Sequence, residues 1–247
     1  MIMNKKVEYV GKDLEAMDFA VNYHRWILTL MKPFLGKHLV EVGAGTGAFS
    51  ELLLETAPET LSLIEPSAMF ESLQTNVAKH NSTTEIRAFP NIFAEVAEKI
   101  KTEQSPDSII YINVLEHIED DRLELEIIHR TLRESGRVFV FVPALPALFS
   151  EFDKHIGHFR RYRKSDLAEK MRAAGFRILL SRYFDAAGIL PWLVKYRLLK
   201  SLTMESGAVH AYDKYVVPVA QPIESWLPLP LGKNLLFVAE KIDGDLK

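Results

Sequence analysis

The stretch HLVEVGAGTGAFS, residues 38–50, decides how this chain folds. An apolar run ends in Glu41, and glycines follow at every second position, at Gly43, Gly45 and Gly47. Glycines between a strand and a helix let the backbone approach a ligand closely, and the helix N-terminus behind them favours negative charge. The stretch therefore predicts a strand, a ligand-binding turn and a helix.

Short apolar runs alternate with longer amphipathic ones along the rest of the chain. This alternation indicates βαβ units and a parallel sheet with helices on both faces. We therefore expect an α/β, Rossmann-like fold with a seven-stranded, mostly parallel sheet. The expected strands span residues 38–42, 61–65, 84–89, 107–115, 136–143, 176–184 and 233–242.

We expect a single domain with two additions to its core. Its parts are a helical cap (1–36), a cofactor-binding core (37–185), an insertion (186–232) and the last strand with the tail (233–247). The insertion is expected to be irregular outside an amphipathic stretch that pairs apolar residues with Lys195, Arg197 and Lys200. That pattern suits a lid over the active site or a surface resting on a membrane. The dense apolar stripe and the few basic positions favour a lid.

Composition excludes several classes of function. A net charge of -3 gives no overall attraction to nucleic acid, and the chain has no cysteine for a thiolate metal site or a nucleophile. The longest apolar stretch, residues 186–194, is far shorter than the roughly 20 residues of a membrane-spanning helix. The N-terminus has no apolar core of signal-peptide length. We expect a soluble, cytoplasmic protein with at most peripheral membrane contact, and no metal ligands.

The spacing of the glycines narrows the choice of ligand. The dinucleotide fingerprint G-x-G-x-x-G and the phosphate loop Gly-Lys-Ser/Thr are both absent, which argues against an NAD-dependent oxidoreductase. Glu65 ends the second expected strand, where an acidic residue accepts both hydroxyls of a ribose. The turn and Glu65 together predict an adenosine-like ligand.

Four segments, in this order, resemble the motifs of the class I S-adenosylmethionine-dependent methyltransferases. They are VEVGAGTGAFS, LIEPSAMF, INVLEHIEDD and LRESGRVFVFVP. The fourth departs from the family's usual L-x-P-G-G at residues 134–136. A later GHFRRY and the GKNLLFVAEK of the last strand resemble a methyltransferase type 11/12-like subgroup. The resemblance covers roughly residues 15–185 and implies an antiparallel last strand and S-adenosyl-L-methionine as cofactor.

The resemblance also implies roles for individual residues. Glu65 would bind the ribose, and Asn91 would take the place of the aspartate that often binds the adenine amine. Tyr23 would reach the cofactor carboxylate, unless it belongs to the core. The implied cofactor contacts are Tyr23, Glu41, Gly43, Ala44, Gly45, Thr46, Gly47, Glu65, Pro66, Met69, Pro90, Asn91, Ile92, Asn113, Val114 and Leu115.

Methyl transfer from a sulfonium is an in-line displacement, so the protein mainly positions the acceptor. A carboxylate acceptor needs no base, whereas a hydroxyl acceptor benefits from one, most often histidine. The candidate catalytic residues are His117, His155, His158 and Tyr162. The alternative role for His117 is to orient the turn after the fourth strand.

The segment KHIGHFRRYRK, residues 154–164, holds five Lys or Arg residues and no acid. It predicts an anion-binding loop in which Arg160 or Arg161 grips the substrate through two hydrogen bonds. Asp153 would orient His158 or pair with an arginine. The alternative is a solvated loop before the next helix.

The leading hypothesis is methyl transfer to an oxygen, carboxylate or hydroxyl, of a small or medium anionic biosynthetic molecule or peptide. A sugar or lipid-linked glycan is the alternative acceptor. A non-catalytic, cofactor-binding partner subunit is the alternative of another class.

Overall fold

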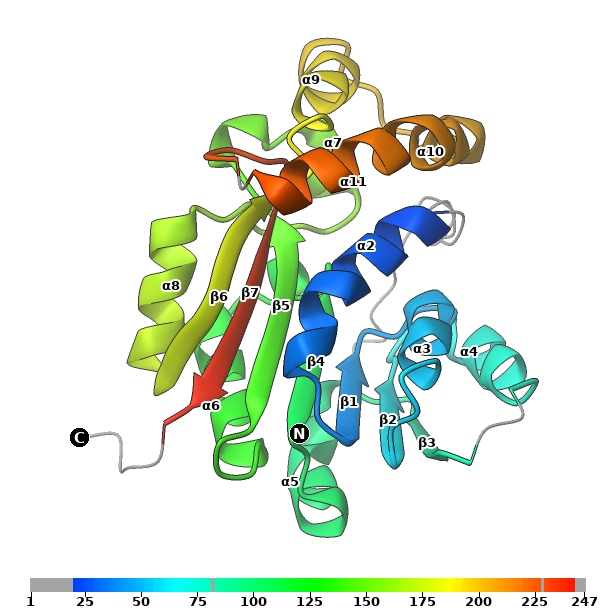
Figure 1. Ribbon diagram of the computed structural model, residues 1–247, viewed down its shortest axis with the longest axis vertical. Coiled ribbons are helices and arrows are strands. Elements are labelled where there is room, and N and C mark those ends of the chain that lie inside the picture. Colours follow the sequence, from blue (N-terminus) through cyan, green and yellow to red (C-terminus); the bar gives the residue numbers. More distant parts are fainter. Residues whose placement is uncertain (1–19, 81–82, 228, 243–247) are drawn as a thin grey trace, which may run out of the picture.

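Residues 20–80, 83–227 and 229–242 are described by the computed structural model. Seven strands form one sheet in the order β3-β2-β1-β4-β5-β7-β6 (Figure 1). They are β1 His38–Val42, β2 Thr60–Ile64, β3 Glu85–Phe89, β4 Ser108–Ile112, β5 Arg137–Pro143, β6 Phe176–Phe184 and β7 Asn234–Lys241. The strands from β3 to β5 pair in parallel, and β7 runs antiparallel to both of its neighbours. The predicted Rossmann-like fold with an antiparallel last strand is confirmed.

Helices cover both faces of this sheet. The helices are α2 Val21–Met31, α3 Ala48–Leu54, α4 Phe70–Val77, α5 Phe93–Gln104, α6 Asp121–Thr131, α7 Glu151–His155, α8 Lys164–Ala173, α9 Ile189–Trp192, α10 Ser206–Ala211 and α11 Val217–Trp226. Short 3-10 turns span Lys32–Phe34, Leu115–His117 and Pro146–Leu148, and π-helical turns span Leu193–Leu198 and Tyr212–Val216. Helices α2, α3 and α4 pack on one face, and α5, α6 and α8 pack on the other.

Strand β5 shows why the sheet has two cores. Its side chains alternate between the two faces, as the pleat requires. Val138 and Val140 belong to the cluster of α5, α6 and α8, whereas Phe139 and Phe141 belong to the cluster of α2 and α3. All four are fully buried, so the continuous apolar run of this strand follows from burial on both sides.

Strand β4 is shorter than expected, and its end shapes the site. It stops at Ile112 because Asn113 adopts a left-handed conformation, with φ of 53°. A 3-10 turn, Leu115–His117, follows in place of the predicted end of the strand. The turn lies at the carboxyl end of the sheet, where open α/β folds bind their ligands.

Two sequence signals for helix starts, Pro66-Ser67 and a capping Ser165, do not mark where the helices begin. Helix α4 begins at Phe70 rather than at Pro66, because the loop before it wraps the carboxylate of Glu65, to which the Ser67 amide donates. Ser165 does not cap α8; it lies inside the helix and its hydroxyl donates to Asp166.

The insertion is largely helical, and the expectation of an irregular segment was wrong. Helices α9 to α11 lie across the carboxyl ends of β5 and β6 and the amino end of β7 (Figure 1). Asp213, from this segment, accepts hydrogen bonds from the amides of Asn22 and Tyr23 at the start of α2. Helix α2 has no side-chain cap of its own, so the insertion supplies it.

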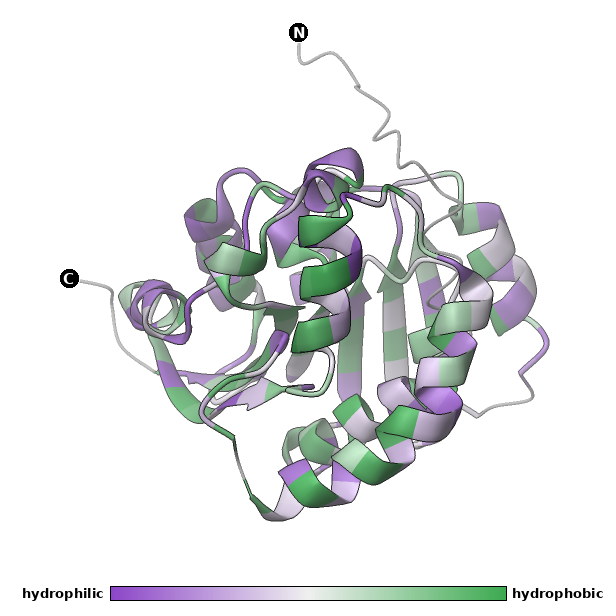
Figure 2. Ribbon diagram, turned by 90° about the horizontal axis from the view of Figure 1, so that it is seen from above, coloured by the Kyte–Doolittle hydropathy of each residue, from purple (hydrophilic) through white to green (hydrophobic). Residues whose placement is uncertain are grey.

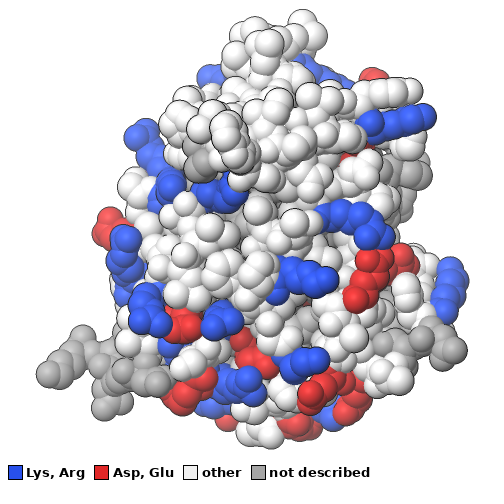
Figure 3. Space-filling view, viewed as in Figure 1, with Lys and Arg blue, Asp and Glu red and all other residues white. Residues whose placement is uncertain are grey.

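These helices carry many apolar side chains on their outer surface. Seen from above, apolar bands recur along them (Figure 2), and the surface around them is largely uncharged (Figure 3). Trp226 is 89% exposed and Leu199 73% exposed. Within the described residues, no helix is long and apolar enough to cross a membrane.

Candidate active site

The glycine turn has the backbone shape that its sequence predicts. Gly43, Gly45 and Gly47 have φ of 71°, 57° and 97°, in the left-handed region that glycine tolerates. A Cβ atom on Gly43 would lie 2.4 Å from Cγ2 of Val114, whereas one on Gly45 would meet nothing within 4 Å. Gly43 therefore allows close packing against the loop after β4, and Gly45 borders open space for a ligand.

Glu65 faces this turn across the ends of β1 and β2. Its carboxylate is buried and accepts the Gly45 amide on Oε2 and the Ser67 amide on Oε1, both at 2.8 Å. A carboxylate oxygen has two lone pairs, so each oxygen can accept a further bond from a ribose hydroxyl. The open space over Gly45 and this fixed carboxylate fit an adenosine-bearing cofactor.

Glu41 lies within β1, two residues before Gly43, and its predicted contact with the cofactor stays a prediction. Its side chain is buried in β1 and accepts the hydroxyl of Ser50, on α3, at 2.5 Å. Burial raises the pKa of Glu41 to about 8; the Ser50 hydrogen bond opposes this rise, and the charge of Glu65 adds to it. The contact links the strand to the helix behind the glycine turn.

The remaining predicted cofactor residues lie at the carboxyl end of the parallel strands. The loops that follow β3, β2, β1 and β4 are neighbours there, because these strands are adjacent and parallel. They carry Ala44, Thr46, Pro66, Met69, Pro90, Ile92 and Leu115. The Asn91 amide donates to Glu95 at 3.0 Å, and Ile92 is 46% exposed. The adenine contacts of these two residues stay predictions.

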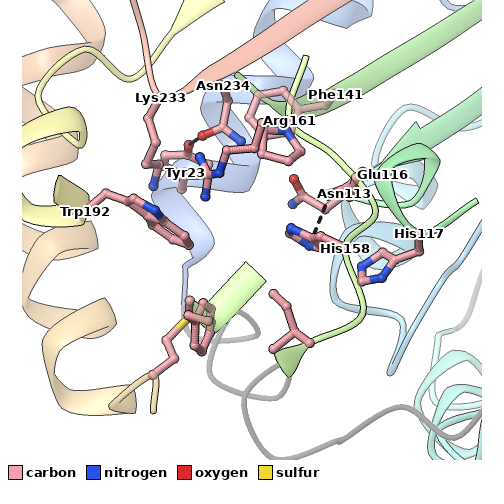
Figure 4. A pocket seen from close by; sticks show the side chains of 14 residues that line it. Tyr23, Asn113, Glu116, His117, Phe141, His158, Arg161, Trp192, Lys233 and Asn234 are labelled. Carbon is pink, nitrogen blue, oxygen red and sulfur yellow. Dashed lines mark hydrogen bonds and ion pairs between the residues drawn. The ribbon is translucent and has the colours of Figure 1, made fainter. Parts of the chain in front are cut away.

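A cavity opens beside this end of the sheet, between the ends of β4, β5 and β7 and the helices of the insertion (Figure 4). We call it the strand-end cavity; its empty space is about 670 Å³. Its walls include Phe141, Phe152 and Trp192, and Asn113 reaches it from the loop after β4. A cavity with an apolar lining and a few polar groups, at this position in an open α/β sheet, is typical of a site for a small molecule.

Three polar side chains form a cluster on one side of the strand-end cavity. They are Glu116 and His117 from the turn after β4, and His158 from the loop after α7. The two imidazole rings lie edge to face with centroids 4.6 Å apart, and His158 Nε2 is 3.8 Å from Glu116 Oε1. Across the cavity they face Trp192 and Lys233 (Figure 4).

Burial sets the charge of this cluster. It raises the pKa of Glu116 to about 8 and lowers that of His117 to about 3. It also lowers the pKa of His158, although Asp153, whose Oδ1 is 3.0 Å from Nδ1 of that ring, opposes the shift. At neutral pH both imidazoles are therefore neutral, and Glu116, whose pKa lies nearest to neutral, is the group of the three that can exchange a proton.

The two arginines of the basic loop have different positions. Arg161 lines the strand-end cavity, is paired with Asp153 at 2.9 Å and stacks on Trp192, 4.3 Å from the ring centroid. Arg160 lies outside both cavities described in the structure and is held by Asp121 at 2.9 Å. Only the first of them can contact a ligand in the strand-end cavity without moving.

The candidate catalytic residues divide in the same way. His117 and His158 line the strand-end cavity, whereas His155 is exposed on α7. The Tyr162 hydroxyl is buried and donates to Asp121 at 2.9 Å, away from the cavity. Catalytic roles for His155 and Tyr162 gain no support from this placement.

Tyr23 lies in the core and at the site at once. It packs edge to face on Phe141 and Phe184 and lines the strand-end cavity. Its hydroxyl is 3.1 Å from both Asp185 Oδ2 and Asn234 Oδ1. A contact with the cofactor carboxylate stays a prediction.

Sequence reasoning missed several residues of the strand-end cavity. Glu116 stands next to His117 in the quoted INVLEHIEDD, and Lys233 and Asn234 begin the quoted last strand, but no role was assigned to them. Lys233 is paired with Asp185 at 3.0 Å and lies over the ring of Trp192. The sequence around Trp192 does not indicate a site residue, because only the packing of the insertion brings this side chain to the cavity.

Comparisons with known proteins agree with this geometry. A family model for the methyltransferase domain matches residues 17–181. No curated protein matches the chain. One similar solved structure is a complex between the Haloferax volcanii Trm112 methyltransferase activator and a putative methyltransferase, with 16% identity, 94% of each chain covered and a TM-score of 0.60.

Two further solved structures have the same fold. A SAM-dependent methyltransferase from Archaeoglobus fulgidus is 16% identical over 92% of this chain and 98% of its own, with a TM-score of 0.58. A geranyl diphosphate methyltransferase, in complex with GPP and sinefungin, is 14% identical over 89% of this chain and 78% of its own, with a TM-score of 0.60. The chain belongs to the methyltransferase domain family, and it is a class I methyltransferase that uses S-adenosylmethionine.

Proposed function

We propose that the chain transfers the methyl group of S-adenosylmethionine to a hydroxyl oxygen of a small or medium acceptor that carries negative charge. The acceptor binds in the strand-end cavity. The observation that carries this proposal is the cluster of Glu116, His117 and His158, which lines the cavity together with Asn113. The resemblance to class I methyltransferases implies that Asn113 lies under the reactive sulfonium.

The cofactor supplies the electrophile, so the chain's own residues bind and orient. Glu65 holds the ribose, and the turn from Gly43 to Gly47 lets the backbone approach the amino-acid end. The transfer forms one C–O bond and breaks one C–S bond, releases S-adenosylhomocysteine, and sends the hydroxyl proton to the cluster or to water. Because a carboxylate acceptor needs no group to take a proton, the cluster favours a hydroxyl.

The walls of the cavity support an acceptor with an apolar part and an anionic part. Phe141, Phe152 and Trp192 offer aromatic surface, and Arg161 and Lys233 offer positive charge. A guanidinium has five N–H donors. Arg161 uses three of them, two on Asp153 and one on the carbonyl of Ala144, so it retains donors for an anion. The geranyl diphosphate methyltransferase of the same fold acts on such an apolar anion.

We infer that residues 186–232 act as a lid. Trp192 and Met204, from this segment, line the strand-end cavity and also a second cavity that is bounded by α2 and α10. A cover of this kind excludes water from the reacting atoms.

A mass-spectrometric experiment tests the transfer. The protein is incubated with S-adenosylmethionine carrying an isotope-labelled methyl group and with a cell extract, and labelled products are identified. We expect an anionic product whose label survives mild alkali, because methyl ethers resist hydrolysis that cleaves methyl esters. An alkali-labile label would point to a carboxylate, and a label on nitrogen or carbon would contradict the proposal.

The second candidate is a non-catalytic partner subunit. The exposed apolar residues of the insertion favour it, because they offer a surface to a partner protein. This candidate predicts cofactor binding without any labelled product. A labelled glycan would instead support the alternative acceptor class, a sugar or a lipid-linked glycan.

A further inference from the structure

Glu116 is an unusual carboxyl group for a protein interior. It is fully buried, and neither carboxylate oxygen has a hydrogen-bond partner on another described residue. Nearly all buried polar groups in proteins are hydrogen-bonded, because desolvation without compensation is costly. The side chain also lines the strand-end cavity, so a ligand there can supply the missing partner.

Two imidazoles lie around this carboxylate. One ligand atom each from Glu116, His117 and His158 can be chosen so that all three lie within 4.8 Å of one another. The three atoms around a tetrahedral zinc ion are roughly 3.4 Å apart, given Zn–N and Zn–O bonds of about 2.0–2.2 Å. Side-chain rotations that bring the ligand atoms closer by up to about 1.4 Å are therefore sufficient for shared coordination.

Asp153 orients one of these imidazoles. Its Oδ1 lies 3.0 Å from Nδ1 of His158, which leaves Nε2 on the side of Glu116, 3.8 Å from Oε1. Asp153 is itself fixed by Ser150, whose amide and hydroxyl both donate to its Oδ2. A carboxylate that holds the far nitrogen of a histidine is the usual second layer of a metal site.

The local charges favour a cation. Glu116 and Asp153 are acidic, and Arg161, which pairs with Asp153, is the cation among the residues that line this side of the cavity. Because metal binding releases the proton of a ligand, Glu116 coordinates as a carboxylate, and these three residues then carry a net charge of -1.

We propose that Glu116, His117 and His158 bind one divalent cation at the wall of the strand-end cavity. Two imidazoles and one carboxylate suit a borderline ion such as Zn²⁺, and three protein ligands leave a coordination position open. The sequence alone predicted no metal, because nothing in INVLEHIEDD shows that His158 folds back onto it.

The open position gives the cation a role at the acceptor. A hydroxyl oxygen bound there has a lowered pKa, so its proton passes to water and no separate base is needed. The cation neither gains nor loses electrons. This role rests on the proposed function, whereas cation binding does not.

Titration of the full chain with metal tests the site. The protein is treated with a chelator, dialysed, and titrated with Zn²⁺ by calorimetry and with Co²⁺ by visible absorption. We expect one ion per chain and the absorption bands of a low-symmetry Co²⁺ site. Loss of even an outer partner of a metal ligand weakens binding about 10–100-fold, so we expect Glu116→Gln and His158→Asn to weaken it at least as much.

Controls separate the site from general effects of mutation. His155→Asn removes an exposed imidazole three residues from His158 and is expected to bind Zn²⁺ like the wild type. S-adenosylhomocysteine affinity, measured in every variant, reports an intact fold and is expected to be unchanged. Glu116→Gln preserves shape while removing the charge, so it is the variant most suited to fold.

Three results would overturn parts of the proposal. A dissociation constant for Zn²⁺ above about 1 mM in the wild type would refute the proposed metal site. If Glu116→Gln and His158→Asn bound Zn²⁺ as tightly as the wild type, the ion would bind elsewhere, and the proposed metal site would be refuted. Full methyl transfer by the chelated protein would remove the acceptor role alone, and metal binding without any transfer would count against the proposed function instead.

Discussion

Glu41 lies within β1 and Glu65 directly follows the adjacent strand β2, yet their surroundings differ. Glu65 accepts two backbone amides beside the open space over Gly45, whereas Glu41 has one hydroxyl partner, Ser50, inside the fold. The sequence placed both residues at the cofactor. Burial cannot be read from either position, because it depends on how α3 packs on the sheet.

Glu41 makes stability depend on pH. Its pKa is about 8 in the folded state and about 4.5 when unfolded, so between these values the folded chain holds a proton that the unfolded chain releases. Stability from this group is present below pH 4.5 and is lost as the pH rises through 8. Glu41→Gln removes the titration and keeps an acceptor for Ser50.

We expect the stability of Glu41→Gln, relative to the wild type, to rise by a few kcal/mol between pH 5 and pH 8, at about 1.4 kcal/mol per pH unit. Urea unfolding at pH 5, 6.5 and 8 measures this difference. Equal pH dependence in the two proteins would show that Glu41 does not titrate in this range.

The cluster of Glu116, His117 and His158 shows which residues of the site can be predicted from the sequence and which cannot. His117 and His158 were both predicted as candidates, and both line the strand-end cavity. Glu116 was missed, since its lack of partners is a property of the folded interior. Arg160 was predicted as a substrate contact from charge alone, which cannot reveal that Asp121 already holds it.

Helix α2 is the element whose stability depends most clearly on a distant segment. The residue before it, Ala20, has no side chain that could cap the helix. The carboxylate of Asp213 accepts the Asn22 amide at 3.1 Å and the Tyr23 amide at 2.8 Å, so a residue about 190 positions away performs the capping.

We expect Asp213→Ala to destabilise the protein by about 1–2 kcal/mol, as the loss of a helix cap does. Asp213→Asn keeps an oxygen acceptor and should lose less. Urea unfolding of both variants against the wild type gives the values. An unfolding free energy of Asp213→Ala equal to that of the wild type would mean that solvent replaces this cap without cost.

Strand positions were the most predictable elements. Those of β1 and β6 match the sequence, because each is a complete apolar or β-branched run bounded by turns. The expected β4 was too long, since a run of apolar letters does not show that Asn113 turns the backbone left-handed. The helices of the insertion escaped prediction because Pro191 and Pro222, which both lie within helices, read as breakers.

At the scale of the whole molecule, Asp185 connects α2, the insertion and the start of β7, which are far apart in the sequence. It follows β6, is fully buried, and contacts Tyr23 of α2, Tyr212 and Gly188 of the insertion, and Lys233 before β7. Strand order and contacts of this kind depend on residues far apart in the chain, which is why the sequence gives the class of fold more readily than the site.

We expect the insertion and the core to unfold together. Among its described residues, the insertion forms no core cluster of its own; Val217 is fully buried in the same cluster as Trp26 and Phe184. Urea transitions followed by far-ultraviolet circular dichroism and by tryptophan fluorescence should coincide, because the three tryptophans lie in α2 and the insertion. A fluorescence transition at lower urea would show that the insertion opens on its own.

The central claim is that Glu65 and the glycine turn hold S-adenosylmethionine. Isothermal calorimetry of the wild type, Glu65→Gln and the matched control Glu71→Gln, an exposed residue of α4, measures this most directly. We expect the wild type and Glu71→Gln to bind alike, and Glu65→Gln to bind at least about tenfold more weakly, since a hydrogen bond to a charged group contributes roughly 1.5–3 kcal/mol. Unchanged affinity in Glu65→Gln, or no binding by the wild type, would contradict the account.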